Sequence, residues 1–420
     1  MTQDNITLLD HKNIILGVTG RIAAYKAVDL ASKLTQAGAK VDVIMTQSSQ
    51  RFVTPLAFQS VTGRAVYTTM WQTDSSGGLP THIAHVGLGE GADLLVIAPC
   101  TANTMAKIAH GLADDLLSVT ALAARCPMVI APAMDGGMFS AEVTQFNIRI
   151  LQGRGVMVVQ PEEGRFASGL VGKGRLPETP ALIGHIRRML GRDRALKGRK
   201  IVVTAGGTRE AIDPVRYISN RSSGKQGYAL AQAALDAGAK EVVLISAAQL
   251  PTPTGATLLP VNSAAEMLYA VLEHTPDADA LLMAAAVADF TPEHVATQKI
   301  KKKADSNDAP TLVLTRTPDI LLVVKKLRED TGFPRVVVGF AAESEDLLTN
   351  ARAKLERKGM DLLVGNDITA SDAGFEVDTN RVILLDASGG QETPCLISKA
   401  AVGEIVIQRV AALLNGLTNL

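Results

Sequence analysis

Short apolar runs rich in β-branched residues alternate with segments of helical periodicity along almost the whole chain. This alternation is typical of parallel sheets whose strands are joined by covering helices, so it predicts an α/β fold. The predicted strands of the first half are Asn13–Val18, Lys40–Met45, Asp93–Ala98, Met128–Ala131 and Val156–Val159. Those of the second half are Lys200–Ala205, Glu241–Ser246, Ala280–Ala284, Val336–Phe340, Asp361–Val364 and Arg381–Leu385. Each half restarts the pattern and no fixed-period repeat is present, so we expect two doubly wound, Rossmann-like sheets and not a solenoid.

One segment between the two halves is charged and almost free of large apolar side chains. It is Gly191–Lys200, and it follows the helical segment Pro180–Leu190. Linkers between domains have this composition. We therefore predict two domains, residues 1–190 and 191–420, in line with the prior of about 150 residues per domain. A second polar segment, Thr291–Thr311, is rich in lysine and has little periodicity, so we expect a mobile loop outside the core.

The charge balance argues against a broad basic surface, because 42 Lys and Arg residues match 42 Asp and Glu residues. Nucleic-acid binding is therefore not expected. The three cysteines, Cys100, Cys126 and Cys395, fit no metal-ligand spacing and cannot all pair, which favours reduced thiols. Met1–Asp10 lacks the apolar core of a signal peptide, and apolar runs such as Leu94–Ala98 are far shorter than the roughly 20 residues of a membrane helix. We expect a cytoplasmic protein with no membrane partner.

A polar loop follows the first strand of the second half. The chain turns through Gly206 and Gly207 and reaches Val215–Lys225, which ends in Ser-Ser-Gly-Lys before a helix. A Gly-rich turn and a helix N-terminus can bind phosphate through backbone N–H groups and the helix dipole. The loop is not a Walker A loop, because Ser219 stands where that motif needs glycine and Gln226 where it needs Ser or Thr. It therefore predicts a nucleotide-binding site of another kind.

This loop, the run Ala286–Phe290 and the lysine cluster Lys299–Lys303 together resemble phosphopantothenate–cysteine ligase. The resemblance implies that CTP activates the carboxylate of 4′-phosphopantothenate as an acyl-cytidylate, with release of pyrophosphate, before the amine of cysteine attacks. It implies that Asn220 holds the acyl phosphate, that Asp289 binds Mg²⁺ and that Lys299 stabilises charge in the second half-reaction. From the residues alone, Asn220 could instead form an Asx turn, Asp289 could cap a helix and Lys299 could lie in a solvated loop.

Three later segments, Thr317–Ile320, Gly339–Glu343 and Gly365–Asp367, resemble the nucleotide-contacting segments of the same family. Phe340 could stack on the base or belong to the core, and the choice of CTP over ATP rests on the resemblance alone. The implied nucleotide-binding residues are Gly206, Gly207, Asp289, Lys299, Pro318, Asp319, Ile320, Phe340 and Asn366.

The first half opens in a comparable way, because Gly17–Ala24 ends a strand and begins a helix. Small residues at such a turn let a phosphate approach the backbone, although they also serve to pack a helix on a sheet. The spacing of Gly17 and Gly20 does not fit the dinucleotide fingerprint, so we favour a mononucleotide. At the end of the next strand, Thr46 and Ser48 could bind phosphate or cap a helix.

Two more runs, Ala98–Thr104 and Ala131–Phe139, follow strand ends where open α/β sheets bind ligands. With the opening turn they resemble the flavin-dependent cysteine decarboxylases, specifically phosphopantothenoylcysteine decarboxylase. From about Lys12 to Val410, the two halves together resemble the bifunctional coenzyme A biosynthesis enzymes. The resemblance implies a flavodoxin-like N-terminal domain that binds FMN and, from the family's assemblies, a homo-oligomer. The implied FMN-binding residues are Gly17, Thr19, Gly20, Thr46, Ser48, Pro99, Thr101, Ala102 and Asn103.

His85 fits the catalytic histidine of this family, because the run His85–Leu88 precedes Ala92 and Asp93, and the competing His82 does not fit. A histidine that titrates near neutrality suits proton transfer. The resemblance implies that FMN oxidises the substrate thiol and that carbon dioxide then leaves. The product regains its electrons together with a proton from an enzyme acid.

Two residues depart from the family pattern. Asp135 stands where a neutral amide usually grips the substrate carboxylate, and Ser168 stands where a cysteine usually supplies the proton. An ionised Asp135 would repel the substrate, whereas its protonated form could donate a hydrogen bond. We favour a working variant in which both residues are catalytic. The alternatives are a flavin half that is structural, regulatory or limited to oxidative decarboxylation, and a peptide-cysteine decarboxylase, which would leave the ligase half unexplained.

Overall fold

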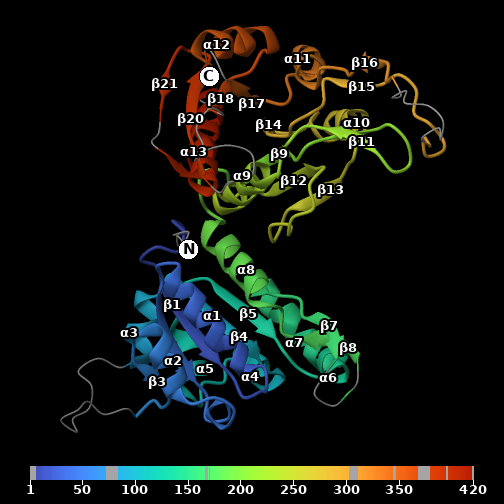
Figure 1. The fold of residues 1–420 in the computed structure, drawn as a ribbon. Coiled ribbons are helices and arrows are strands. Elements are labelled where there is room, and N and C mark those ends of the chain that lie inside the picture. The colour runs from blue at the N-terminus through green and yellow to red at the C-terminus, as the bar shows by residue number, and fades with distance from the viewer. Residues whose placement is uncertain are drawn as a thin grey trace. The chain divides into compact units, whose positions relative to one another are not determined.

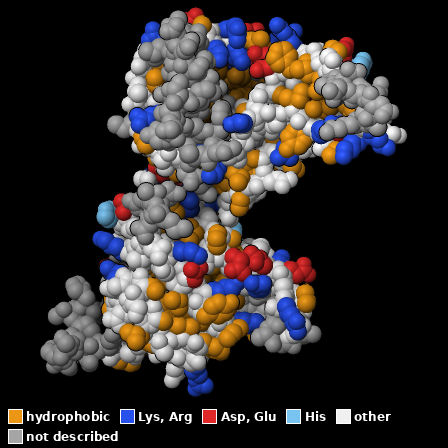
Figure 2. All heavy atoms as spheres, viewed as in Figure 1, with side chains coloured by type: hydrophobic (Ala, Val, Ile, Leu, Met, Phe, Trp, Pro, Cys, Tyr) orange, Lys and Arg blue, Asp and Glu red, His pale blue; other side chains and the backbone are white. Residues whose placement is uncertain are grey.

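The computed structural model describes residues 6–71, 84–165, 169, 171–301, 311–343, 347–367, 379–393 and 396–418. The chain forms two compact units, Met1–Gly191 and Arg192–Leu420, and each is described by itself (Figure 1). Each unit has helices on both faces of a mainly parallel sheet, which confirms the predicted α/β class. On the face drawn in Figure 2, acidic and basic side chains are interspersed over each unit.

The sheet of the N-terminal unit is parallel throughout and has the strand order β3-β2-β1-β4-β5-β6. Its strands are β1 (Asn13–Val18), β2 (Lys40–Met45), β3 (Val66–Tyr67), β4 (Leu94–Cys100), β5 (Met128–Pro132) and β6 (Met157–Val158). This is a doubly wound order with its switch point between β1 and β4. Without the two-residue strand β3, the remaining strands follow the flavodoxin-like order that the sequence led us to expect.

Helices cover both faces of this sheet (Figure 1). One face carries α1 (Ala24–Gln36), α2 (Pro55–Thr62) and α8 (Thr179–Gly191). The other carries α3 (Ala84–Gly91), α4 (Ala102–His110), α5 (Leu116–Ala123) and α7 (Glu142–Gly153). In α1, Ala27, Leu30, Ala31 and Leu34 recur at helical spacing and are buried, and each buried leucine contributes about 1.5–3 kcal/mol. The shorter elements are η1 (Ser49–Arg51), α6 (Gly136–Ser140), β7 (Glu162–Arg165) and β8 (Val171–Arg175).

The sheet of the C-terminal unit has the order β13-β12-β9-β14-β17-β18-β20-β21, and its pairings are parallel except for β18 with β20 and β20 with β21. Its strands are β9 (Lys200–Ala205), β12 (Glu241–Ser246), β13 (Thr257–Pro260), β14 (Ala280–Met283), β17 (Val336–Glu343), β18 (Leu362–Asp367), β20 (Val382–Asp386) and β21 (Gln391–Glu392). The switch point lies between β9 and β14. Smaller two-stranded sheets pair β10 (Arg209–Ala211) with β11 (Tyr217–Ser219), β15 (Phe290–Pro292) with β16 (Leu314–Arg316), and β19 (Thr379–Asn380) with β22 (Ile397–Ser398).

The helices of the C-terminal unit also divide between two faces. α9 (Lys225–Asp236) and α13 (Lys399–Thr418) pack on one face. α10 (Ala264–His274), α11 (Ile320–Thr331) and α12 (Leu347–Lys358) pack on the other. Among the described helices, α13 alone is long and apolar enough to cross a membrane. Its Val402, Val406, Val410 and Leu414 are buried in the core with α9, so it is weak evidence for a membrane span.

The predicted strands are confirmed, with ends that differ by up to three residues. The predicted loop Thr291–Thr311 is wrong at its start, because Thr291 and Pro292 belong to β15 and Pro292 is buried. The partner of β15 is β16, which lies more than twenty residues later in the chain, so no local pattern announces the pairing. Residues 302–310 of that segment lie outside the described part.

Candidate functional site

The candidate site of the N-terminal unit lies at the carboxyl ends of β1, β2, β4 and β5, where a turn follows each strand. Thr19 joins two of these turns. Its side chain is buried, and its hydroxyl donates a 2.7 Å hydrogen bond to the carbonyl oxygen of Pro99 and accepts a 3.0 Å bond from the N–H of Thr101. Thr19 therefore braces the β1 turn against the β4 turn, and its hydroxyl is already engaged.

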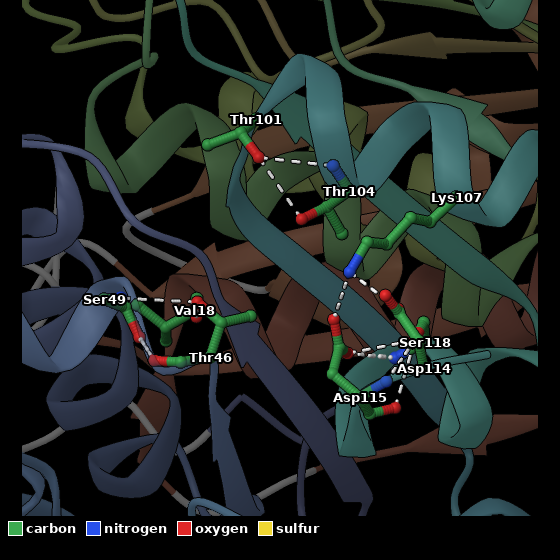
Figure 3. Close-up of polar contacts among 9 residues, drawn as sticks. All are labelled: Val18, Thr46, Ser49, Thr101, Thr104, Lys107, Asp114, Asp115 and Ser118. Carbon is green, nitrogen blue, oxygen red and sulfur yellow. Dashed lines mark hydrogen bonds and ion pairs between the residues drawn. The ribbon is translucent and has the colours of Figure 1, made fainter. Parts of the chain in front are cut away.

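The turns after β1 and β2 also touch each other. A β-carbon at Gly20 would lie 2.3 Å from the β-carbon of Ser48, so only glycine fits without a shift of the backbone. The hydroxyl of Thr46 donates to the carbonyl oxygen of Val18 at 3.4 Å and accepts from the N–H of Ser49 at 3.3 Å (Figure 3). Ser48 is exposed beside this contact. Together these residues form a compact polar edge beside the switch point.

Thr101 begins α4, and its side-chain oxygen accepts a 3.3 Å hydrogen bond from the N–H of Thr104 (Figure 3). The positive end of this helix favours a bound phosphate. Further along α4, Lys107 pairs with Asp114 at 2.6 Å and with Asp115 at 2.9 Å. The hydrogen bond with Asp114 is the main cause that raises the pKa of Lys107, so its charge is secure at neutral pH. These ion pairs tie α4 to the start of α5.

Asp135 begins α6, where its carboxylate accepts a 2.9 Å hydrogen bond from the N–H of Gly137. It borders an open pocket of about 600 Å³ that also contains Phe139 and Lys173. Arg21, in the turn after β1, interacts with Asp135 across the site. Burial lowers the pKa of Arg21, and the negative charge of Asp135 acts to raise it. The residue that departs from the family pattern thus has a cationic neighbour that sequence reasoning missed.

The other predicted residues of this site differ in their surroundings. Gly17 and Pro99 are buried within β1 and β4, so they contribute to the packing of the strand ends and do not face solvent. Ala102 is half-buried and Asn103 is exposed, both in the first turn of α4. His85 is half-buried in the first turn of α3. Gly17 and Pro99 therefore have a packing role, whereas Asn103 is open to a ligand.

These turns fit the phosphate end of a flavin mononucleotide. Gly20 lets the turns after β1 and β2 pack together, Ser48 beside Thr46 adds an exposed hydroxyl, and α4 presents its N-terminus. Ser168 and the competing His82 lie outside the described residues. The assignment of Ser168 as the proton donor therefore stays a prediction from the sequence.

The candidate site of the C-terminal unit is a pocket of about 540 Å³ at the ends of β14, β17 and β18, a volume typical of small-molecule sites. The predicted residues that line it are Asn220, Asp289, Pro318, Asp319, Ile320, Phe340 and Asn366. Asp289 is exposed, and Phe340 is half-buried and also packs against the core. The predicted Gly206, Gly207 and Lys299 are not among its lining residues.

Gly206 and Gly207 have a structural role behind the pocket. Gly206 has a φ of +85°, and Gly207 forms a parallel bridge with Ala286. A β-carbon at Gly207 would lie 2.5 Å from the carbonyl oxygen of Asn220. The side-chain nitrogen of Asn220 donates a 3.0 Å hydrogen bond to the carbonyl oxygen of Val287. The glycines therefore let the polar loop pass close to the end of β14, where Asn220 is held.

The N-terminus of α9 lies in the pocket wall. Its N-cap is Gly224, which has a φ of +77° and offers no side chain to cap the helix. Ser222, Ser223 and Lys225 line the pocket beside it. A helix N-terminus next to a lysine attracts phosphate through both its N–H groups and its dipole.

Three lysines that sequence reasoning missed also line the pocket, namely Lys354 and Lys358 on α12 and Lys399 at the start of α13. Lys358 pairs with Asp319 at 3.1 Å, and Asp319 also caps α11 by accepting from the N–H of Leu322 at 3.4 Å. Asp319 thus fixes a helix and a lysine at the pocket. The lysines come from helices far along the chain from the polar loop, and no local motif distinguishes them from other surface lysines.

The acidic residues of the pocket do not form a metal cage. Among the described residues, no group of three or more His, Cys, Asp or Glu side chains could hold a metal ion. Of the described residues that line the pocket, Asp289 alone offers an exposed carboxylate beside the polar loop. A single carboxylate suits Mg²⁺ that takes its other oxygen ligands from phosphates and water. The residues present therefore fit a metal ion that arrives with a nucleotide.

Comparison with known proteins gives consistent matches over both units. Residues 3–191 match the family model described as Flavoprotein, and residues 196–414 match the DNA/pantothenate metabolism flavoprotein C-terminal domain. The Coenzyme A biosynthesis bifunctional protein CoaBC of Bacillus subtilis (strain 168) is 42% identical over 409 residues, which cover 97% of this chain and 98% of that protein. The protein of the same name from Mycolicibacterium smegmatis is 44% identical over 416 residues, covering 96% and 98%. A crystal structure of the C-terminal domain of a CoaBC protein is 33% identical and covers 53% of this chain and 100% of its own, with a TM-score of 0.45.

Proposed function

Because the chain belongs to the family of coenzyme A biosynthesis bifunctional proteins, it is an enzyme with two activities, and we propose that its two units catalyse consecutive steps. The C-terminal unit joins 4′-phosphopantothenate to cysteine, with CTP as the activating nucleotide. The N-terminal unit decarboxylates the product to 4′-phosphopantetheine. Each unit has its own strand-end site on its own doubly wound sheet and matches its own family model, and this arrangement carries the proposal.

The ligase reaction has two halves. In the first, a carboxylate oxygen of 4′-phosphopantothenate attacks the α-phosphorus of CTP, which forms an acyl-cytidylate and releases pyrophosphate. In the second, the amine of cysteine attacks the acyl carbon, CMP leaves with the electron pair of the acyl–oxygen bond, and the amine loses a proton. Both halves build negative charge on phosphate oxygens, so cations and fixed N–H donors lower their barriers.

The pocket supplies groups for this task. The N-terminus of α9 and the lysines Lys354, Lys358 and Lys399 offset the charge of the triphosphate. Asn220, which is fixed by its bond to Val287, holds the acyl phosphate. Asp289 binds the Mg²⁺ that accompanies CTP. The apolar wall for the base is formed by Pro318, Ile320 and Phe340.

Lys299 acts later than these groups in the proposed reaction. It is exposed and lies outside the lining of the nucleotide pocket. Its charge stabilises the second half-reaction, when the acyl–oxygen bond breaks and the phosphate of CMP becomes the leaving group. Asp319 and Asn366 position their neighbours at the pocket.

In the N-terminal unit, we propose that FMN binds at the turns after β1, β2 and β4. When bound, FMN supplies reversible two-electron chemistry, because it takes two electrons from the substrate thiol and returns them after carbon dioxide has left. Overall the substrate loses carbon dioxide and gains one proton. Gly20, Thr46 and Ser48 hold the phosphate of the cofactor. His85 and Ser168 transfer protons as general acids or bases. Asp135 and its neighbour Arg21 form the place where the substrate carboxylate binds.

The alternative is a flavin unit that is structural or regulatory, or that completes only the oxidative half of the decarboxylation. It is motivated by Asp135 in place of an amide and Ser168 in place of a thiol. The match of residues 196–414 accounts for the ligase half, which a peptide-cysteine decarboxylase would leave unexplained. The remaining question is whether the flavin unit completes the decarboxylation, completes only its oxidative half, or is structural or regulatory.

An anaerobic single turnover separates these accounts. The purified protein should be yellow, should release FMN on denaturation, and should return to oxidised flavin when phosphopantothenoylcysteine is added. Ser168→Ala should delay that return if the hydroxyl relays the proton, and Ser168→Cys should not. Reduced flavin that persists with an enethiol product would show that this unit stops after oxidation. Flavin that is never reduced would show that the unit is structural.

We also propose that the protein is a cytoplasmic homo-oligomer. Cys100 and Cys126 are free thiols, as suits a reducing compartment. Tyr25 on α1 and Leu56 on α2 are 60% and 67% exposed, and apolar side chains gathered at a surface favour contact with another protein. Light scattering should give a mass of more than one chain, whereas a particle of 44.2 kDa would contradict the proposal.

A further inference from the structure

The hairpin β10–β11 is a separate element that leads directly into the ligase pocket. Its strands pair antiparallel from Arg209 opposite Ser219 to Ala211 opposite Tyr217. One end is fixed to the core, because the buried carboxylate of Glu210 accepts a 2.8 Å hydrogen bond from the N–H of Ala264 at the start of α10. The residue after Ser219 is Asn220, so the hairpin and the acyl-phosphate site share one continuous stretch of chain.

The turn of this hairpin is organised by Asp213, whose side chain is fully buried. Its carboxylate accepts hydrogen bonds from the N–H groups of Val215 at 2.8 Å and Arg216 at 2.9 Å. It also receives the guanidinium of Arg216, with Nε at 2.9 Å. One more bond reaches outside the hairpin, because the N–H of Ile300 donates to Asp213 at 3.1 Å. Asp213 therefore joins the hairpin turn to a segment 87 residues away.

That segment is held from two further points. The guanidinium of Arg216 donates a 2.9 Å hydrogen bond to the carbonyl oxygen of Ile300, so both backbone groups of this residue are engaged. The N–H of Ala296 donates a 3.0 Å bond to the carbonyl oxygen of Ile212. Residues 296–300 are thus fixed to the hairpin turn at both ends, and Lys299 stands next to the fixed Ile300.

We infer that Asp213 is a positioning residue of the ligase, which fixes the segment carrying Lys299 to the same hairpin that presents Asn220. This inference rests on the proposed function, in which Asn220 serves both half-reactions and Lys299 serves the second. A lysine side chain on an unrestrained loop samples many positions. Fixing the backbone beside Lys299 reduces the conformational entropy that must be lost to reach the reactive geometry. Asn220 has its own bond to Val287, so it does not depend on the contact with Ile300.

The electrostatics of the turn suit this role. The hydrogen bonds from Arg216 are the main cause that holds the pKa of Asp213 well below its usual range, so the carboxylate stays charged at any working pH. A buried carboxylate that accepts hydrogen bonds from several backbone N–H groups and from a guanidinium joins these groups strongly and in a fixed geometry. Replacement by Asn would remove the charge and turn an NH₂ group toward N–H donors.

The test measures the two half-reactions separately in the full-length protein. Asp213→Asn should leave pyrophosphate release from CTP and 4′-phosphopantothenate within about twofold of wild type, and should slow amide formation by roughly tenfold or more. The acyl-cytidylate should therefore accumulate in rapid-quench samples. Asp277→Asn is the matched control, because Asp277 also forms an ion pair in this unit, with Lys200 at 2.6 Å, but lies on the surface. The control should behave as wild type in both halves.

A second pair of variants addresses the contact itself, should Asp213→Asn fail to fold. Ile300→Pro removes the N–H that donates to Asp213 and also restricts the backbone of residues 299 and 300, whereas Ile300→Ala keeps the N–H. The proline variant should repeat the selective loss, and the alanine variant should not. Equal slowing of both half-reactions in Asp213→Asn or Ile300→Pro, or no slowing of the second, would overturn the positioning role. Wild-type protein that releases no pyrophosphate would instead overturn the proposed ligase function and this inference with it.

Discussion

Asn220 and Val287 are joined by a 3.0 Å hydrogen bond from the side-chain nitrogen of the first to the carbonyl oxygen of the second. The two residues lie 67 positions apart, one after β11 and the other after β14. The bond brings the polar loop to the end of the sheet where α9 also begins. The ligase site is thus assembled by contacts between strand ends, in the way that doubly wound sheets build their ligand sites.

Asn220→Asp tests this relationship with a nearly isosteric change. A carboxylate oxygen would face the carbonyl oxygen of Val287, and a negative charge would enter a site that must bind phosphate. We expect pyrophosphate release to fall by roughly 100-fold or more, the size of effect seen when one fixed donor is lost from a catalytic site. Flavin content should not change, because FMN binds to the other unit. Wild-type pyrophosphate release would show that Asn220 does not touch the acyl phosphate.

Thr19→Val tests the brace between the β1 and β4 turns. The change keeps the shape of the side chain but leaves the carbonyl of Pro99 and the N–H of Thr101 without their buried partner. We expect a loss of about 1–3 kcal/mol in stability and weaker retention of FMN. Thermal unfolding with and without added FMN measures both effects. Thr54→Val is the control, because Thr54 begins α2 without a side-chain capping bond. Equal behaviour of the two variants would contradict the brace.

Arg21 is close enough to Asp135 for the negative charge of Asp135 to act on the pKa of Arg21, which burial lowers. Arg21→Ala would leave the charge of Asp135 uncompensated where the substrate carboxylate binds, so we expect carbon dioxide release to slow by roughly tenfold. Adding Asp135→Asn to this variant should recover much of the loss, because the neutral amide no longer repels the substrate. Initial rates of carbon dioxide release for the single and double variants decide the matter. Additive losses in the double variant would mean that the two residues act independently.

The pKa of Asp213, held low mainly by its hydrogen bonds with Arg216, predicts a pH-dependent contribution to stability. A carboxylate with a lower pKa in the folded state stabilises that state above its unfolded pKa of about 3.9, and loses this effect as the pH falls through the folded pKa. Asp213→Asn should therefore unfold at lower denaturant than wild type at pH 7. The difference should shrink as the pH falls below about 4. A difference that stays constant from pH 7 to pH 3 would contradict this origin.

Sequence patterns predicted the central strands well because those strands are buried on both faces. Runs such as Asn13–Val18 and Glu241–Ser246 are almost continuously apolar, and the structure has them with the predicted ends. The hairpins are different. All residues of β16, Leu314–Arg316, are exposed, so no alternation of apolar and polar residues distinguishes them from a loop. Such pairs depend on tertiary contacts that the local sequence does not show.

The site residues also differ in how far the local sequence predicts them. Asp289 could be placed from the chain because it follows β14, and strand ends gather at one edge of a parallel sheet. Asn220 follows a strand of a separate hairpin, and only the resemblance to the ligase family pointed to it. Lys399 comes from the start of the last helix, and its approach to the pocket follows from the packing of α13 beside α9. The contact between Asp213 and Ile300 spans 87 residues. Neither has a motif, so only the folded chain reveals them.

The most direct test is a single incubation of the purified full-length protein with 4′-phosphopantothenate, cysteine, CTP and Mg²⁺, with mass spectrometry of every product. We predict pyrophosphate, CMP and carbon dioxide in equal amounts with 4′-phosphopantetheine, each far in excess of the enzyme. Phosphopantothenoylcysteine should appear first and then decline. Accumulation of phosphopantothenoylcysteine without carbon dioxide would contradict a working flavin unit, and the absence of pyrophosphate would contradict the ligase on which the whole account depends.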